Sequence, residues 1–124
     1  MIRDDLVQRC DAYLTAVETK NTDALVALFA ADARQYEPIG SEPNVGHDAI
    51  RAFFTRNPSV QLKLNRMGPV TVAGRYAAMQ VRVEVDRDGA RARLTTTDVI
   101  EFDEDGRIVS LYAIPDRDAD PDVV

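Results

Sequence analysis

The chain has 124 residues, of which 45% are hydrophobic and 29% are charged. These proportions are typical of one globular domain and leave too few residues for two. The 15 basic and 21 acidic residues give a formal net charge of −6 at pH 7. Because such a chain repels phosphate groups and anionic lipids, we expect neither nucleic acid nor a membrane surface as its partner. The segment MIRDDLVQRC places two aspartates where a secretory signal would be apolar, so we expect a cytoplasmic protein.

The counts of cysteine and histidine exclude several kinds of site. Cys10 is the only cysteine, so neither an intrachain disulfide nor a cysteine-rich zinc site can form. His47 is the only histidine, and it lies in the sequence Gly46-His47-Asp48, which is typical of a helix start. We therefore expect His47 to be a surface or capping residue, and any chemistry to depend on carboxylates and tyrosines.

The first half of the chain shows helical patterning. Apolar residues recur at spacings of three and four, and this predicts three helices, at residues 3–20, 23–31 and 47–55. Asn21 is expected to cap the second of them. Between the second and third helices, residues 33–37 are predicted to be extended, and the Gly- and Pro-rich segment 38–46 is predicted to be a loop.

The second half alternates apolar and polar residues and contains two Asp-Gly turn signals. This pattern predicts strands at residues 70–72, 76–86, 90–102 and 107–114. Helices followed by antiparallel strands indicate an α+β domain, in which the helices cover one face of a curved sheet. We assign residues 1–115 to this single domain. The acidic tail, residues 116–124, is predicted to be disordered.

Asp98 interrupts the apolar face of the strand predicted at 90–102. The residues of its parity mark the core side: Ala92, Leu94, Thr96, Asp98, Ile100 and Phe102. An ionised carboxylate among these side chains would lose several kcal/mol of hydration, and burial would raise its pKa. A neutral Asp98 that donates a hydrogen bond is one reading. Two alternatives remain: a bulge could turn the residue to solvent, or a buried arginine could pair with it.

Two further polar residues are candidates for the same site. Tyr13 lies on the apolar face of the first predicted helix, so its ring is expected to be buried and its hydroxyl to need a partner. That partner could simply be a backbone carbonyl. Glu37 ends the extended segment before Pro38, at the expected rim of the space between helices and sheet. Most glutamates in such a position are only solvated.

The segment VALFAADARQYEPIGSEPNVGHDAIRAFF resembles the corresponding part of the bacterial steroid Δ5-3-ketoisomerases, the ketosteroid isomerases of the NTF2-like superfamily. Tyr13 precedes Glu37 by 24 residues and Asp98 follows it by 61, and both separations match the family's catalytic residues. The similarity extends from about residue 6 to about residue 113. The resemblance implies a cone of three helices on a strongly curved mixed sheet around an apolar pocket, and a homodimer.

The resemblance also implies an activity. It assigns Glu37 as the base and Tyr13 with a neutral Asp98 as hydrogen-bond donors to the substrate oxygen. The reaction would be cofactor-free isomerisation of a 3-oxo-Δ5-steroid to its 3-oxo-Δ4 isomer, with no metal. The substrate pocket is expected to include Val17, Phe54, Val81, Val83 and Leu111.

Three positions depart from the family pattern. The family's base is normally aspartate, where this chain has Glu37. Phe54 stands where the family commonly has a second tyrosine, and Pro115 stands where it often has an aromatic pocket residue. Two other functions remain open on the sequence. One is a non-catalytic NTF2-like lipid- or steroid-binding protein. The other is a related enzyme, a polyketide cyclase or epoxide hydrolase, which usually needs a His-Asp pair or an Asp-Arg-Asp set.

Overall fold

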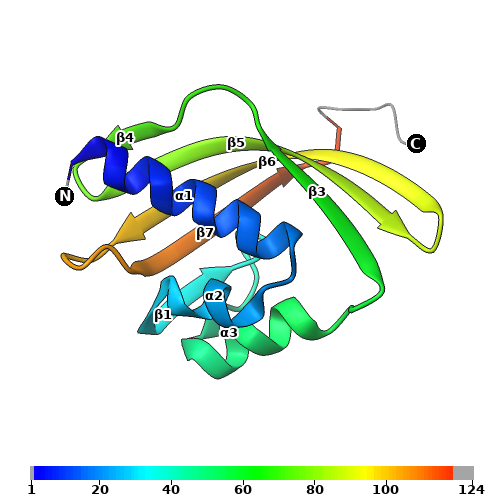
Figure 1. The fold of residues 1–124 in the computed structure, drawn as a ribbon, viewed down its shortest axis with the longest axis horizontal. Coiled ribbons are helices and arrows are strands. Elements are labelled where there is room, and N and C mark those ends of the chain that lie inside the picture. Colours follow the sequence, from blue (N-terminus) through cyan, green and yellow to red (C-terminus); the bar gives the residue numbers. More distant parts are fainter. Residues whose placement is uncertain (1, 119–124) are drawn as a thin grey trace.

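The computed structural model describes residues 2–118 (Figure 1). Its three helices are α1 (Arg3–Glu18), α2 (Thr22–Ala27) and α3 (Gly46–Thr55). The strands are β1 (Phe29–Tyr36), β2 (Asn44–Val45), β3 (Val60–Arg66), β4 (Thr71–Ala73), β5 (Tyr76–Arg87), β6 (Ala90–Phe102) and β7 (Ile108–Asp116). Most of the predicted disordered tail, residues 119–124, lies outside the described residues.

The strands form one mixed sheet in the order β2-β1-β7-β6-β5-β3, with β4 on the edge of β5. The β1–β7 pair is parallel and the other pairs are antiparallel. The sheet is strongly curved, with α1 across its concave side and α2 and α3 beside β1 (Figure 1). This arrangement confirms the predicted α+β cone with three helices on a curved mixed sheet.

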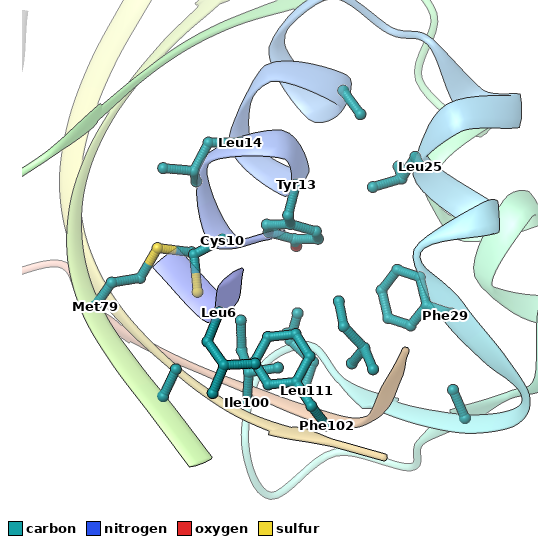
Figure 2. Packing of buried hydrophobic residues seen from close by; sticks show 14 of the residues in the cluster. Leu6, Cys10, Tyr13, Leu14, Leu25, Phe29, Met79, Ile100, Phe102 and Leu111 are labelled. Carbon is teal, nitrogen blue, oxygen red and sulfur yellow. The ribbon is translucent and has the colours of Figure 1, made fainter. Parts of the chain in front are cut away.

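The core lies between α1 and the concave face of the sheet. Figure 2 shows Leu6, Cys10 and Tyr13 of α1 turned toward Met79, Ile100 and other apolar side chains of the strands. Burying a side chain of this size stabilises the fold by roughly 1.5–3 kcal/mol. None of the helices among residues 2–118 has the length and apolar character needed to cross a bilayer.

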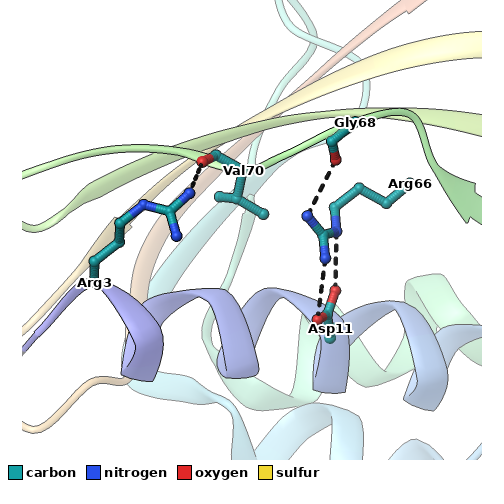
Figure 3. A network of polar contacts seen from close by, with 5 residues as sticks. All are labelled: Arg3, Asp11, Arg66, Gly68 and Val70. Carbon is teal, nitrogen blue, oxygen red and sulfur yellow. Dashed lines mark hydrogen bonds and ion pairs between the residues drawn. The ribbon is translucent and has the colours of Figure 1, made fainter.

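Polar contacts at the sheet edge fix α1 in position (Figure 3). Arg66 Nε of β3 donates to Asp11 Oδ1 of α1 at 3.1 Å, and Arg66 Nη1 donates to the Gly68 carbonyl at 3.1 Å. Arg3 at the start of α1 donates to the carbonyl of Val70 at 2.7 Å. Because a bidentate guanidinium restrains orientation as well as distance, these contacts hold the helix that carries Tyr13.

The second predicted helix is too long by several residues. Asn21 caps α2 as predicted, accepting a hydrogen bond from the Ala24 amide at 3.3 Å, but the helix ends at Ala27. From Phe29 the chain is a strand, because its backbone pairs with β7 and the Ile108 amide donates to the Leu28 carbonyl at 2.8 Å. Long-range pairing therefore outweighs the helical spacing of apolar residues in this segment.

Two strands were not predicted. β3 alternates half-buried and exposed residues over its length and pairs with β5 from Val60↔Arg87 to Arg66↔Val81. Its period of two is visible in the sequence. The two-residue β2 is not, because it forms only by pairing with Arg34 and Gln35 of β1.

Candidate active site

A cavity of about 260 Å³ opens between the concave face of the sheet and the helices. Its lining comes from the three helices and from strands β3, β5 and β6, together with the residue that follows β1. Tyr13, Glu37 and Asp98 all line it, although they are far apart in the sequence. The fold therefore brings the three predicted catalytic residues to one space.

Tyr13 is held by aromatic contacts and is free to donate a hydrogen bond. Its side chain is 5% exposed and packs edge-on against Phe29 and Phe54, with ring centroids 6.3 Å and 6.4 Å away. Among residues 2–118, no backbone or side-chain group hydrogen-bonds its hydroxyl. The expected backbone partner is thus absent within this range, and the hydroxyl is available to a ligand.

Asp98 is buried on the core side of β6, at 5% exposure. It pairs in unbroken register with Met79 of β5 and Ala113 of β7, so no bulge turns it to solvent. No arginine forms an ion pair with it in the described part of the chain. The structure therefore excludes the bulge and, among the described residues, the arginine partner, while the neutral hydrogen-bond donor stays a prediction.

Glu37 follows Tyr36, the last residue of β1, and lines the cavity. Its Oε2 atom is buried and has no hydrogen-bond partner among the described residues. A carboxylate oxygen without a partner is costly to bury, and such atoms are uncommon outside functional sites. Glu37 is therefore not the simply solvated residue that its position in the sequence would allow.

Burial raises the pKa of all three groups, and negatively charged neighbours add to this for Glu37 and Tyr13. Burial raises the pKa of Asp98 to about 7, and a smaller effect of the neighbouring Thr96 side chain lowers it. Burial, and then the charge of Asp98, raise the pKa of Glu37 to about 8, while Arg56 lowers it. Burial and both carboxylates raise the pKa of Tyr13 well above its usual value. The groups therefore interact as one coupled cluster.

Four of the five predicted pocket residues line this cavity and one does not. Val17, Phe54, Val81 and Val83 form part of its apolar wall. Leu111 is fully buried in the core on β7, where it contributes to packing and not to the cavity surface. Pro115 is also outside the lining, because it lies beyond Leu111 on β7, opposite Thr96.

His47 lies in the first turn of α3, away from the cavity lining. Its Nε2 atom is 2.8 Å from the Phe29 carbonyl, so the ring joins α3 to β1 and is partly buried. Within residues 2–118, no three His, Cys, Asp or Glu side chains are grouped as metal ligands would be.

Three cations at the cavity mouth were missed by sequence reasoning. Lys20, Arg56 and Arg87 are exposed and line the opening. Each follows or ends a regular element, namely α1, α3 and β5. Their common position could be inferred only once the ends of these elements were known to meet.

The fold and the cavity define a class of α+β cone proteins with a carboxyl-lined pocket. A family model described as a SnoaL-like domain matches residues 10–111. The chain is 33% identical over 101 residues to the Steroid Delta-isomerase of Nocardioides simplex, covering 82% of this chain and 81% of that protein. The chain therefore belongs to the SnoaL-like family of the NTF2-like superfamily.

Two solved structures have the same fold at low sequence identity. One is an LEH-like epoxide hydrolase of M. tuberculosis, with a TM-score of 0.80, 18% identity, and coverage of 91% of this chain and 84% of that one. The other is SalBIII, an epoxide hydrolase/cyclase-like enzyme in pyran ring formation in the polyether salinomycin. Its TM-score is 0.83, its identity is 21%, and the coverage is 91% and 92%.

Proposed function

We propose that this protein is a steroid Δ5-3-ketoisomerase, which moves a double bond into conjugation with a ketone by proton transfer and without a cofactor. The observation that carries the proposal is the meeting of Tyr13, Glu37 and Asp98 at one apolar cavity, each with a raised pKa. The similarity to a steroid isomerase over most of the chain supports the same substrate class.

Glu37 is the proton carrier in this proposal. As a carboxylate, it removes a proton from the carbon between the ketone and the double bond, and it returns the proton two carbons further along the resulting dienolate. A base is most effective when its pKa lies near the working pH, and burial moves Glu37 to about 8. Its buried, unpartnered Oε2 atom is the oxygen available for this transfer.

Tyr13 and Asp98 stabilise the negative charge that develops on the ketone oxygen. Both are donors when protonated, and both face a site from which most water is excluded. Preorganised donors in such a site are worth about 2.7–4 kcal/mol each to the transition state. Tyr13 remains protonated at neutral pH because its pKa is raised.

The reacting form has a protonated Asp98 and an ionised Glu37. In the protein alone the pKa of Glu37 is about 8 and that of Asp98 about 7, which is the reverse of the order that the reaction uses. A ketone oxygen that accepts a hydrogen bond from Asp98 stabilises the neutral acid and raises its pKa. Substrate binding therefore favours the productive arrangement of the single proton that the pair shares near neutral pH.

Two residues adapt the site to this chemistry. Glu37 is one methylene longer than aspartate, which gives the carboxylate reach between the two carbons at some loss of positional precision. Phe54 packs edge-on against Tyr13 and provides no hydroxyl, so the phenol keeps its single proton for the substrate. The anchoring of Tyr13 consequently depends on aromatic packing with Phe29 and Phe54.

The test is the growth of enone absorbance from 5-androstene-3,17-dione with purified protein. Turnover above the buffer rate that is lost in Glu37→Gln, with folding and steroid binding retained, supports the proposal. A wild-type rate equal to buffer rejects it. Exchange of substrate protons with deuterated solvent separates catalysis from passive binding, because a binding protein would take up the steroid without exchange.

A further inference from the structure

The groups facing the cavity change character in order along the sheet. β5 presents alternate residues to the concave side, and its partners in β3 and β6 lie beside them. Beginning at the catalytic end, successive positions on this face carry Asp98 beside Met79, Thr96 beside Val81, Leu64 beside Val83, Leu62 beside Val85, and Val60 beside Arg87. The face is therefore acidic at one end, apolar in the middle and cationic at the other end.

The length of this face separates the two polar ends. Met79, the strand neighbour of Asp98, and Arg87 are eight residues apart on β5, which corresponds to about 26 Å along the strand at the usual rise per residue. The curvature of the sheet and the length of the Arg87 side chain make the gap between the two groups shorter than this path (Figure 1). A ketone held at Asp98 therefore lies far from Arg87. Only a ligand with a long apolar body and a polar group at its far end could reach both.

The three cations of the mouth form no ion pair among the described residues, although Arg56 is close enough to Glu37 to lower the pKa of that carboxyl. Arg56 stacks on the ring of Phe53 at 4.4 Å, and Lys20 donates to the Pro58 carbonyl. Neither Lys20, Arg56 nor Arg87 forms an ion pair within residues 2–118. This positive cluster occurs in a chain whose net charge is −6, so it does not follow from composition.

The acidic residues nearest in sequence to Lys20, Arg56 and Arg87 form hydrogen bonds or ion pairs with other groups, or lie in a turn. Asp23 pairs with Arg51 at 2.9 Å, and Glu18 accepts a hydrogen bond from the Leu64 amide at 2.7 Å. Asp86 accepts from the Gly89 amide at 2.8 Å. Asp88 lies in the β5–β6 turn and does not line the cavity. Apart from Glu37, which interacts with Arg56, these acidic side chains leave the rim positively charged.

We propose that the substrate carries a carboxylate at the end remote from the reacting ketone, and that the rim of Lys20, Arg56 and Arg87 binds this group. The inference rests on the proposed function, which places the ketone at Asp98. It adds a substrate class, an apolar ketone with an acidic tail. Arginine favours this role because its planar guanidinium matches a carboxylate.

A structural role explains only part of the rim. Lys20 and Arg56 follow the carboxyl ends of α1 and α3, where a cation also complements the helix dipole. Arg87 ends a strand, which has only a small net dipole, so this explanation does not apply to it. Arg87 is therefore the residue that best separates ligand binding from helix stabilisation.

The experiment compares one acid with its own methyl ester. The probes are 3-oxo-4-cholen-24-oic acid and its ester, which are reaction products and bind without turnover. Binding is measured by calorimetry in wild type, in Arg87→Gln and in the double variant Arg56→Gln/Arg87→Gln. Arg75→Gln is the matched control, because Arg75 is exposed and immediately precedes the opposite end of β5.

We expect the acid to bind about three- to tenfold more tightly than the ester, the range expected of exposed ion pairs acting together. Arg87→Gln reduces this ratio, the double variant brings it close to one, and Arg75→Gln leaves it unchanged. A salt concentration of 1 M also removes the preference for the acid over the ester, because the screening length falls to about 3 Å. The ratio is insensitive to any change in Glu37, because both probes share the same ketone.

Equal binding of acid and ester by the wild type overturns the inference, as does a preference that survives both arginine substitutions. Thermal unfolding of each variant verifies folding, and Arg87→Gln alone serves if the double variant is unstable. Failure of the proposed function has a different signature. In that case 5-androstene-3,17-dione is not isomerised, while the preference for the acid over the ester persists.

Discussion

The two ends of the cavity use charged residues in opposite ways. The end of the cavity that holds Asp98 and Glu37 is called the closed end, because both carboxyls are buried there without ion-pair partners among the described residues. Burial raises the pKa of Asp98 to about 7, and burial with the charge of Asp98 raises that of Glu37 to about 8. At the mouth, Lys20, Arg56 and Arg87 are exposed to solvent. Charges at the mouth interact through water and are screened by salt, whereas those inside interact through a medium of low polarity. Burial therefore decides whether a charged residue performs chemistry or provides attraction.

This contrast predicts how strongly each substitution acts. Changes at the closed end alter the reacting groups and reduce turnover by orders of magnitude. Changes at the mouth alter affinity by small factors that depend on salt. The following experiments test the closed end, from the largest expected effect to the smallest.

Substitution of the base has the largest effect. Glu37→Gln keeps the size of the side chain but removes its ability to accept a proton, so kcat for 5-androstene-3,17-dione falls by about 10³–10⁴-fold. The control is Glu42→Gln, an exposed glutamate of the following loop, which keeps the wild-type rate. A Glu37→Gln protein that retains a tenth of the activity would assign the base elsewhere.

Removal of one oxyanion donor has the next largest effect. Tyr13→Phe and Asp98→Leu each lower kcat by about 10²–10³-fold, since each deletes one hydrogen bond that strengthens in the transition state. Steroid affinity changes much less than kcat. Tyr76→Phe, at an exposed tyrosine outside the cavity, serves as the control. If the variants changed KM and left kcat at the wild-type value, the donor role would be contradicted.

The pH profile reports the coupled carboxyls. Below pH 7 the pair gains a second proton and Glu37 can no longer act as a base, whereas above pH 8 Asp98 loses the proton that it donates. We therefore expect kcat/KM to be greatest between pH 7 and 8 and to fall roughly tenfold per pH unit on either side.

Asp98→Asn sharpens this test. It keeps a hydrogen-bond donor but removes the titrating acid, so the alkaline limb disappears. Because Asp98 is already neutral on the acidic limb, the substitution does not move that limb to lower pH. A profile identical to that of the wild type would show that these carboxyls do not govern the reaction.

The smallest effect is on stability. Asp98 and Glu37 have higher pKa values in the folded than in the unfolded protein, so the folded state binds more protons between about pH 4 and 8. Stability consequently falls as pH rises across this window. We expect Asp98→Asn to raise Tm by a few degrees at pH 9 and to change it little at pH 4. The exposed Asp32→Asn is the control, with Tm followed by circular dichroism.

The sequence predicts much of the fold because its local signals agree with the final packing. The predicted strand 90–102 has the bounds of β6, and the burial of Asp98, Ile100 and Phe102 follows from the alternation alone, whereas Thr95 of the predicted solvent face is buried. The boundary of α2 could not be predicted, since Phe29 joins a strand only through its pairing with Ile108, far along the chain. Apolar spacing carries no information about such a partner.

The candidate site, like the fold, could be predicted from the sequence only where local patterns carry the information. Local patterns singled out Tyr13, Glu37 and Asp98 one by one, but only the family resemblance linked them, because no local pattern connects residues so far apart. Leu111 was misplaced since a buried residue of the sheet can face either the core or the cavity, and parity does not distinguish the two. The cationic rim was overlooked because element ends meet only in three dimensions.

The parallel pairing of β1 with β7 has a consequence for how the protein matures. Glu37 follows directly on Tyr36, whose ring stacks on Tyr112 of β7 at 4.6 Å between centroids. During synthesis, a nascent chain that has not yet released β7 from the ribosome cannot anchor the end of β1. Such an intermediate would contain all three proposed catalytic residues and still lack an ordered site, so the proposed activity would report that the last strand has docked.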